Sequence, residues 1–574
     1  MKRTHNCSEL KKTNVGEEVV LQGWVNSIRN HGGITFVNLR DRSGITQTVI
    51  PESLADIVKD VRREFVLEVI GIVDSRKDGM ENKNMSTGEI EVTAKNVNII
   101  AKCDVLPMDM DDGAEVSDET RLKYRYLDLR KPTMKNNIIF RSKVMQSMRE
   151  FLLNKDFLEL ETPLLVKSTP EGARDYVVPS RVNKGKFYAL PQSPQLYKQL
   201  LMVSGFEKYF QFARCLRDED LRADRQPEHT QLDLEMSFVD GESVRSLIED
   251  MIKFVFKKTK NVELEDFKVL SYNTAMETYG SDKPDLRFGL ELTTVSDVVK
   301  TSSFNVFSQA EYVNCLFVDK DFSRKEIDKL TDVAKRHGAK GLAWMKYSES
   351  FDGGITKFIE EPIQKALIEK LNISSPGTLL FVADKKRVAQ NALGNVRLAI
   401  ADKLELKDPN VFKFSWITDF PLFHFVEEEN RWEPEHHMFS MPKQEFVENF
   451  EKNPGETLGD LWDLALNGME MASGSIRISN PEIQKRIMNF VGFPEEEAKE
   501  KFGFLLDAYK YGCPSHGGIG LGIARLVSMM LGVDDIREVI IFPKNKNAQC
   551  PMDESPGFID EAQLDELGIK IKKD

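Results

Sequence analysis

A pair of alternating segments joined by a charged loop, FARCLRDEDLRADRQPEHTQLDLEMSF at residues 212–238, constrains this chain more than any other feature. Apolar and polar residues alternate on both sides of the loop, which predicts two antiparallel strands in a hairpin. Alternation places Asp233 and Glu235 on one face, with Arg217 and Glu219 facing them if the strands pair. A solvated face with ion pairs would account for such a hairpin taken alone. The alternative is a face that binds a charged ligand, and other segments favour it.

Two further segments complete a pattern with this hairpin. Near the C-terminus, HGGIGLGIARLVSMMLG predicts a glycine-rich strand that ends at Gly522 and leads through Arg525 into an apolar helix. An arginine at a strand-to-helix junction is suited to bind a phosphate. Earlier in the chain, RSKVMQSMREFLLNKDFLELETPLL predicts an amphipathic helix and a strand that stops at Pro163. Each of these two segments alone is also compatible with ordinary packing.

Together the three segments resemble the three signature motifs of class II aminoacyl-tRNA synthetases. The stretches STPEGARDYVVPSR, FYALPQSPQLYKQLLMVSGFEKYFQ and RDEDLRADRQPE make the chain similar to aspartyl-tRNA synthetases of the bacterial type. The resemblance extends from GWVNSIR near the N-terminus to FPKNKNA near the C-terminus. It implies ATP-dependent activation of L-aspartate to aspartyl-adenylate, followed by transfer of the aspartyl group to tRNA(Asp).

Composition restricts the class of protein. A chain of 574 residues is too long for one hydrophobic core and predicts about three or four domains. With 41% hydrophobic and 30% charged residues, it is typical of a soluble globular protein. It has neither an apolar run long enough to span a membrane nor the apolar core of a signal peptide, so we expect a cytoplasmic protein with no membrane segment. Six scattered cysteines without a C-x-x-C pair argue against a zinc site or a disulfide framework.

The net charge of −13 argues against a protein that binds nucleic acid through its overall charge. Acidic and basic residues balance within residues 1–100, however, so the excess negative charge lies in the rest of the chain. That N-terminal part predicts five short strands with one intervening helix, the pattern of an OB-fold β-barrel. Such folds bind single-stranded nucleic acid through aromatic residues on their strands.

The resemblance makes residues 1–103 the anticodon-binding domain. Phe36 matches the residue on which an anticodon base stacks, and Arg29 and Gln47 match positions that contact anticodon bases. Base stacking on an aromatic side chain contributes roughly 1 to 3 kcal/mol. A place in the barrel core is the alternative for Phe36.

The rest of the chain predicts a multidomain α+β fold. An acidic, irregular segment after the OB-fold is expected to form a hinge. Helices that alternate with strands then predict a self-contained α+β domain inserted in the catalytic domain, which resembles the insertion domain of bacterial aspartyl-tRNA synthetases. The predicted order is a hinge at 104–134, a catalytic domain with an antiparallel sheet at 135–286 and 404–550, the inserted domain at 287–403 and a C-terminal extension at 551–574.

In the reaction that the resemblance implies, the α-carboxylate of aspartate attacks the α-phosphorus of ATP. Catalysis then depends on positioning and charge stabilisation, because the substrate itself is the nucleophile. By match to the family motifs, Arg217 bridges the α-phosphate and the amino-acid carboxylate, Arg525 holds the γ-phosphate, and Asp463 and Glu470 bind Mg²⁺. The other implied ATP-binding residues are Asp218, Glu219, Gln226, His229, Gly522, Ile523 and Ala524, together with Glu470.

Specificity for aspartate requires cations for its side-chain carboxylate, and Lys198 and Arg477 match those positions. Gln195 and Asp233 match the partners of the amino group. Asparagine would leave the two cations unpaired in a desolvated pocket, so we expect strong discrimination against it. His437 neighbours the site, although EHH is also a common surface turn. The full aspartate set implied by the resemblance is Glu171, Gln195, Lys198, Arg217, Asp233, His436 and Arg477.

Several residues depart from the family pattern. His229 occupies the expected adenine-stacking position, where most relatives have phenylalanine. An imidazole buries less area and can titrate, so we expect ATP binding that is weaker or that varies between about pH 5.5 and 8. Ala524 replaces the usual acidic residue before Arg525, Asp156 replaces a usual glycine, and residues 471–473 replace a glycine-rich run. None of these changes removes a predicted catalytic group.

The implied partners are L-aspartate, tRNA(Asp) and a second copy of the chain, since this class generally forms homodimers through the segment around Pro163. His31 and Gly79 match two positions at which enzymes that also charge tRNA(Asn) tend to carry these residues, and such an enzyme needs a tRNA-dependent amidotransferase. The alternatives are an enzyme specific for tRNA(Asp) and a simple turn role, because NHGG and KDGM are strong turn sequences. An asparagine synthetase is disfavoured by the OB-fold, and a non-catalytic tRNA-binding paralogue by the retained charged residues.

Overall fold

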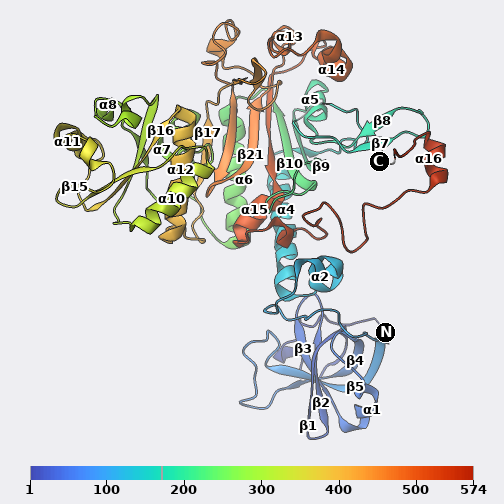
Figure 1. The fold of residues 1–574 in the computed structure, drawn as a ribbon. Coiled ribbons are helices and arrows are strands. Elements are labelled where there is room, and N and C mark those ends of the chain that lie inside the picture. Colours follow the sequence, from blue (N-terminus) through green and yellow to red (C-terminus); the bar gives the residue numbers. More distant parts are fainter. Residues whose placement is uncertain (1, 170–171, 573–574) are drawn as a thin grey trace. The chain divides into compact units, whose positions relative to one another are not determined.

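The computed structural model describes residues 2–169 and 172–572. The chain forms two compact units, Met1–Val116 and Ser117–Asp574. The first unit is a closed five-stranded barrel with the strand order β1-β2-β3-β5-β4, labelled in Figure 1. The OB-fold predicted from the strand pattern is therefore confirmed. Its elements are β1 (Glu18–His31), β2 (Ile34–Arg40), β3 (Ile45–Ile50), helix α1 (Ala55–Val58), β4 (Val66–Ser75) and β5 (Ile90–Ala101).

A tight turn sets the register of the first barrel hairpin. Gly32 and Gly33 adopt φ values of 58° and 82°, the left-handed conformation that a two-residue hairpin turn requires. In this register Arg29 lies opposite Phe36. The next residue of β2, Val37, is fully buried in the barrel core, so Phe36 points to the outer face.

An eight-stranded sheet forms the centre of the second unit, in the order β11-β17-β20-β21-β22-β10-β9-β6. Its inner pairs are antiparallel, and a parallel pair lies at each edge. Helices α4, α6 and α15 pack on one face around a large hydrophobic core (Figure 1). The elements are α4 (Pro132–Asn154), β6 (Leu158–Glu159), β9 (Lys208–Leu216), β10 (Glu228–Ser237), α6 (Gly241–Lys260), β11 (Lys268–Ser271), β17 (Phe414–Thr418), β20 (Leu461–Leu466), β21 (Met469–Ile476), β22 (His516–Gly522) and α15 (Ile523–Leu531).

The hairpin predicted from the sequence is confirmed as β9 and β10, but the predicted facing of its charges is wrong. Asp233 lies opposite Gln211 rather than Arg217. Arg217 and Glu219 lie in the loop, beyond Leu216 at the end of β9. The loop therefore begins earlier than the alternation indicated, and it carries these two side chains away from the acidic residues of β10.

A second, five-stranded sheet lies in sequence between β11 and β17, in the order β12-β13-β16-β14-β15. Helices α10 and α12 pack on one of its faces, and α8, α9 and α11 pack on the other, each side with its own core. Its elements are β12 (Leu292–Thr294), α8 (Ser296–Val299), α9 (Asn305–Ser308), β13 (Tyr312–Val318), α10 (Arg324–Arg336), β14 (Ala343–Tyr347), β15 (Phe351–Asp352), α11 (Glu361–Lys370), β16 (Gly377–Asp384) and α12 (Lys386–Lys403).

Shorter elements complete the second unit. Asp156, at a position where a glycine was expected, adopts a φ of 66°, a left-handed conformation that aspartate tolerates better than most residues. Within the described ranges, none of the helices has both the length and the apolar character needed to cross a membrane. The remaining elements are α2 (Asp118–Lys123), α3 (Arg125–Asp128), β7 (Val177–Pro179), β8 (Phe187–Ala189), α5 (Gln195–Val203), α7 (Tyr272–Tyr279), β18 (Phe423–Val426), β19 (Arg431–Pro434), α13 (Pro481–Phe490), α14 (Glu495–Tyr509) and α16 (Glu561–Leu567).

Candidate active site

Four charged side chains meet on the face of the large sheet that lies opposite α4, α6 and α15. Lys198 of α5 places its Nζ 2.9 Å from Asp233 Oδ1 and 3.4 Å from Glu235 Oε2. Arg477 binds the same carboxylate of Glu235, with Nε 2.9 Å from Oε1 and Nη2 3.2 Å from Oε2. Each of the four residues is at most 3% exposed. Two cations therefore converge on one carboxylate in a desolvated site, where unpaired charge is costly.

Glu235 is absent from the predicted site residues, although its alternation with Asp233 along β10 was a signal for it. Burial opposes ionisation of this carboxyl, but Arg477 and Lys198 outweigh burial and hold its pKa below the ordinary value. Glu235 is thus a permanent anion that keeps the two cations in place. The site is close to neutral before any ligand enters it.

Asp233 and Gln195 each have one polar atom without a hydrogen-bond partner in the part of the chain that the structure describes. Oδ2 of Asp233 and Nε2 of Gln195 are buried and have no hydrogen-bond partner among the described residues. Leaving such groups unpaired costs about 1 to 3 kcal/mol each, so a ligand that pairs both of them would gain that energy. One carboxylate acceptor and one amide donor suit a molecule that carries both an ammonium and a carboxylate, as an α-amino acid does.

The loop that contains His436 and His437 closes one side of the charged group. Nε2 of His437 lies 3.1 Å from Nη1 of Arg477. Burial, together with the charge of Arg477, lowers the pKa of His437 well below its usual range, so this imidazole is neutral. Nδ1 of His436 lies 3.3 Å from Ser473 Oγ, and its Nε2 lies 3.9 Å from Asp463 Oδ2. The EHH sequence therefore lies at the site and is not a surface turn.

Asp463 on β20 and Glu470 on β21 form a second, uncompensated group. Burial raises the pKa of Asp463 to about 7, with nearby His436 opposing the shift and Glu470 reinforcing it. Its Oδ1 is buried without a partner in the part of the chain that the structure describes. A hard divalent cation would relieve both the repulsion and the unpaired oxygen, so this pair fits Mg²⁺. No group of three histidine, cysteine or acidic side chains among the described residues is arranged to hold a metal.

The two predicted catalytic arginines lie just beyond the ends of β9 and β22, the two strands that flank β10 in the sheet. Arg525, in the first turn of α15, donates from Nη1 to the carbonyl of Glu470 at 3.2 Å and from Nη2 to Asp224 Oδ2 at 3.2 Å. Arg217, at the start of the hairpin loop, donates from Nε to the carbonyl of Gln192 at 3.4 Å. Each guanidinium is partly exposed and keeps further donors for an anion.

Other predicted ATP contacts are bonded within the protein. Glu219 accepts from Arg225 at 2.7 Å, and Asp218 lies 3.6 Å from Arg174. Both polar atoms of the Gln226 side chain bind the backbone of Lys544. These bonds shape the hairpin loop, and the predicted contact of each side chain with ATP stays a prediction.

His229 does not behave as the sequence indicated. Burial, together with the charges of Arg217, Arg525 and Arg214, lowers its pKa to about 4. In the free protein the imidazole is therefore neutral across the range from about pH 5.5 to 8, well above that pKa. The titration of the His229 ring that was expected within this range is therefore corrected, because burial and the nearby arginine charges keep the ring neutral.

The glycines of β22 make room for side chains of β10. A Cβ at Gly518 would lie 2.0 Å from Glu235 Oε2, and a Cβ at Gly520 would lie 1.7 Å from Gln231 Nε2. Both distances are far shorter than a van der Waals contact. A Cβ at Gly518 would also lie 2.1 Å from the backbone oxygen of Leu234, so this position requires glycine, whereas the atom nearest Gly520 is the end of the flexible Gln231 side chain. Gly522, with Ile523 and Ala524, forms the junction between β22 and α15, as predicted.

On the barrel, the predicted anticodon residues share the outer face. Arg29 lies opposite Phe36, and Gln47 lies opposite Asn38, two residues further along β2. Gln47 Nε2 donates to Glu91 Oε2 at 2.8 Å. Phe36 is outside the barrel core and partly exposed, so the core alternative for this residue is wrong.

The two predicted tRNA-specificity residues lie in separate turns. His31 is exposed at the end of β1, next to the turn that joins β1 to β2. Gly79 is exposed in another turn and has a φ of 80°. A left-handed backbone favours glycine at such a position whatever its function.

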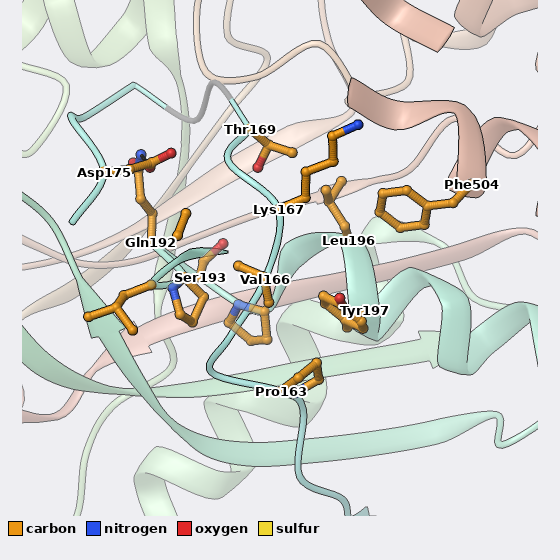
Figure 2. A pocket seen from close by; sticks show the side chains of 14 residues that line it. Pro163, Val166, Lys167, Thr169, Asp175, Gln192, Ser193, Leu196, Tyr197 and Phe504 are labelled. Carbon is orange, nitrogen blue, oxygen red and sulfur yellow. Dashed lines mark hydrogen bonds between the residues drawn. The ribbon is translucent and has the colours of Figure 1, made fainter. Parts of the chain in front are cut away.

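Glu171 lies outside the described residues, but the chain on both sides of it is placed. Figure 2 shows a small pocket lined by Thr169 and Asp175, with Leu196 and Tyr197 of α5 and Phe504 of α14 around it. Gln192 binds the part of the chain that follows Glu171. Its Oε1 accepts from the backbone N–H of Ala173 at 3.1 Å, and its Nε2 donates to Asp175 Oδ1 at 2.6 Å. Residues 173–175 are thus held near α5, the helix that carries Lys198.

Comparison with known proteins agrees with this geometry. A family model described as tRNA synthetases class II (D, K and N) matches residues 117–546, and one described as an OB-fold nucleic acid binding domain matches residues 19–100. The chain is 51% identical over 588 aligned residues to an aspartate–tRNA(Asp/Asn) ligase of Treponema denticola, with 100% of both chains covered. It is 47% identical over 587 residues to an aspartate–tRNA ligase of Ruminiclostridium cellulolyticum, covering 100% of this chain and 99% of that one.

Solved structures share the fold. An asparaginyl-tRNA synthetase from Pyrococcus horikoshii, complexed with asparaginyl-adenylate, matches with a TM-score of 0.60 at 19% identity, covering 95% of this chain and 98% of that one. An aspartyl-tRNA synthetase from Entamoeba histolytica matches with a TM-score of 0.59 at 18% identity, covering 95% and 92%. The chain therefore belongs to the class II tRNA synthetases, the family predicted from its three motifs, and is an aminoacyl-tRNA ligase.

Proposed function

We propose that this enzyme activates L-aspartate with ATP and transfers the aspartyl group to tRNA(Asp). The observation that carries the proposal is the buried group in which Lys198 and Arg477 are held by Glu235. The cations offer two positive partners to a side-chain carboxylate. Asparagine would present a neutral amide to the same two cations, so the pocket favours aspartate. Naming of the relatives as aspartate–tRNA ligases supports the assignment.

The remaining contacts follow from the unpaired atoms. Asp233 would accept hydrogen bonds from the substrate ammonium through its free Oδ2, and Gln195 would donate to a substrate oxygen. Arg217, at the mouth of the hairpin loop, would hold the α-carboxylate against the α-phosphate. His436 and Glu171 would close over the bound amino acid. This arrangement brings the attacking oxygen to phosphorus without a protein nucleophile.

Members of this family use ATP and a divalent metal ion. Here Asp463 and Glu470 would hold Mg²⁺, which neutralises phosphate charge when bound. Arg525 would bind the γ-phosphate, and its bond to the Glu470 carbonyl keeps it beside the metal carboxylates. The predicted contacts of Asp218, Glu219, Gln226, His229 and the segment from Gly522 to Ala524 complete this part of the site.

The barrel would bind the anticodon, with a base stacked on Phe36 and edges read by Arg29 and Gln47. Charging of tRNA(Asn) as well is a second candidate, favoured by His31 and Gly79 and by the Asp/Asn name of the Treponema denticola relative. That activity would require a tRNA-dependent amidotransferase to convert the mischarged product. Charging of tRNA(Asp) alone is the competing possibility, as in the name of the Ruminiclostridium cellulolyticum relative.

We further propose a cytoplasmic homodimer. Leu158, Leu164 and Leu165 around Pro163 are 44%, 49% and 52% exposed, an apolar group that a second copy would cover. The domain order predicted from the sequence is part of this proposal, with the five-stranded sheet as the centre of the inserted domain.

The test is aminoacylation of tRNA(Asp) and tRNA(Asn) transcripts with labelled aspartate, accompanied by ATP–pyrophosphate exchange without tRNA. Aspartate-dependent exchange together with charging of tRNA(Asp) is the expected result. Charging of both transcripts would establish the broader specificity. Exchange that depends on asparagine or lysine instead of aspartate, or no exchange at all, would contradict the proposal.

A further inference from the structure

The segment that follows α15 has an unusual set of backbone partners. Five consecutive carbonyls, from Arg537 to Ile541, each accept a hydrogen bond from a side chain. Arg125 alone donates to three of them, the carbonyls of Arg537, Ile540 and Ile541, at 2.7, 2.8 and 3.0 Å. Asn137 and Arg141 of α4 donate to the other two. Residues Ile536–Val539 form a short 3-10 helix, and side chains rather than a longer helix or a strand ladder supply the partners of these five carbonyls.

The arginine that makes these bonds is itself held in a fixed position. Arg125 is 3% exposed, and its Nη1 donates to Asp128 Oδ2 at 2.7 Å. Asp128 Oδ1 accepts from Arg121 Nε at 3.1 Å, and Arg121 forms two parallel bonds with Glu538, at 2.8 and 2.9 Å. Such paired guanidinium–carboxylate bonds have a defined direction as well as strength. We call Arg121, Arg125, Asp128 and Glu538 the arginine clasp.

The clasped segment, residues 536–544, contacts the loop of the β9–β10 hairpin. At its start, the backbone N–H of Ile536 donates to the carbonyl of Ala223 at 3.1 Å. At its end, Lys544 is bound by Gln226: Gln226 Oε1 accepts from the Lys544 N–H at 2.7 Å, and Gln226 Nε2 donates to the Lys544 carbonyl at 3.2 Å. Both contacts fall on the loop that begins at Arg217 and carries the predicted ATP contacts. The clasped segment is therefore hydrogen-bonded to that loop near both of its ends.

Accordingly, we propose that Arg121 and Arg125 are positioning residues for ATP: the arginine clasp fixes the backbone of residues 536–544, which in turn holds the hairpin loop over the nucleotide. This inference rests on the proposed function, because the loop is assigned to ATP there. The clasp residues themselves contact neither Arg217 nor the charged group around Lys198 within the hydrogen bonds and ion pairs of the described residues. The aspartate pocket should therefore be less affected than the nucleotide site.

The decisive variant is Arg125→Lys, which keeps the positive charge. A lysine ammonium cannot reproduce the planar fork that serves three carbonyls and Asp128 at once. We expect the KM for ATP in tRNA-free pyrophosphate exchange to rise by about tenfold, the factor that loss of one such hydrogen bond corresponds to. The KM for aspartate should stay within about twofold, because its cations are held by Glu235 rather than by the clasp. Glu538→Gln, which weakens only the bond to Arg121, should raise the KM for ATP less.

A second readout does not depend on activity. Hydrogen exchange of the amides in residues 217–227 should be faster in Arg125→Lys and in Glu538→Gln than in the wild type, because the loop loses its fixed support. ATP binding measured by calorimetry should weaken by the same factor as the KM rises. If the wild-type protein shows no aspartate-dependent pyrophosphate exchange, the proposed function is contradicted. The comparison of hydrogen exchange in the hairpin loop would still test the clasp.

Arg397→Lys provides a matched control. Arg397 on α12 is also buried and donates to the backbone carbonyls of Asp285, Phe288, Gly289 and Leu290, in the part of the fold that joins the second sheet. This variant should lower the melting temperature but leave the KM for ATP and the hydrogen exchange of the hairpin loop unchanged.

An equal rise of the KM for ATP in the Arg397→Lys control would show general loosening and overturn the inference. The inference would also be overturned if Arg125→Lys folds and its KM for ATP is unchanged, or if its KM values for ATP and for aspartate rise equally. Should Arg125→Lys fail to fold, unchanged loop exchange and KM for ATP in Glu538→Gln would overturn it.

Discussion

Two buried carboxylates on the same face of the large sheet differ in how their charge is balanced. Glu235 lies between Lys198 and Arg477, and these cations hold its pKa below the ordinary value despite burial. Asp463 is buried beside Glu470, and its pKa is raised to about 7. The charges of the first region balance without a ligand, whereas the second has two neighbouring carboxyl groups whose charge a cation would neutralise. The pocket proposed for the amino acid is therefore preorganised. The region proposed for the metal and nucleotide reaches charge balance only when a cation binds.

The largest expected effect is that of Glu235→Gln. Removal of this charge leaves two buried cations with one carboxylate, Asp233, to share. We expect the free energy of unfolding at pH 7 to fall by about 3 to 5 kcal/mol, the cost typical of breaking a buried ion pair. Urea denaturation measures it. In the wild type this contribution is present above the ordinary pKa of 4.5 and is lost as the pH falls through the lower native value. A variant as stable as the wild type at pH 7 would refute the idea that Glu235 balances the site.

Arg477→Leu tests the other side of the same ion pair. We expect the KM for aspartate to rise on the order of 10³-fold and the KM for ATP to change little, because the lost cation serves the amino acid. Kinetics of pyrophosphate exchange, with each substrate varied in turn, measures both constants. The KM for aspartate of Arg477→Lys should lie between those of Arg477→Leu and the wild type, since lysine keeps the charge without the two-point contact. Equal changes in both KM values would remove Arg477 from the aspartate pocket.

Asp463→Asn probes the uncompensated region. Because the native pKa of Asp463 is above its ordinary value of 3.8, the native state binds the proton more tightly, and stability of the metal-free protein should fall as the pH rises from about 4 to 7. The variant should lack this slope and be more stable than the wild type at pH 8 by about 2 to 4 kcal/mol. Thermal denaturation without metal, repeated with Mg²⁺, measures it. Mg²⁺ should stabilise the wild type at pH 8 more than the variant, and identical pH profiles would contradict the assignment.

The smallest expected effect concerns His229. Its pKa of about 4 predicts a KM for ATP that is constant from about pH 5.5 to 8, apart from changes shared with a His229→Phe variant. Steady-state kinetics of both proteins over this range makes the comparison. A wild-type profile with a midpoint near pH 6.5 that is absent from the phenylalanine variant would show that the ring titrates in the working enzyme.

Local patterns in the sequence were sufficient for much of the fold. Alternation predicted the five barrel strands and the β9–β10 hairpin, and the glycine-rich run predicted β22 and its junction with α15, because these signals depend on neighbouring residues. The facing of Arg217 and Asp233 was predicted wrongly, since register depends on where the loop begins. Glu235 was missed as a site residue for a related reason: its role depends on Lys198 and Arg477, which come from distant parts of the chain.

By itself, the sequence determined the family, the barrel and sheet architecture and most residue types of the site, because motifs and periodicity are properties of contiguous segments. Only the tertiary structure decided which charges are paired. The low pKa of His229, the raised pKa of Asp463 and the arginine clasp around residues 537–541 all depend on burial or on contacts between segments that lie far apart in the sequence, such as the bond from Arg125 to the carbonyl of Arg537. Burial and the distance between charges set these energies, and both quantities exist only once the chain is folded.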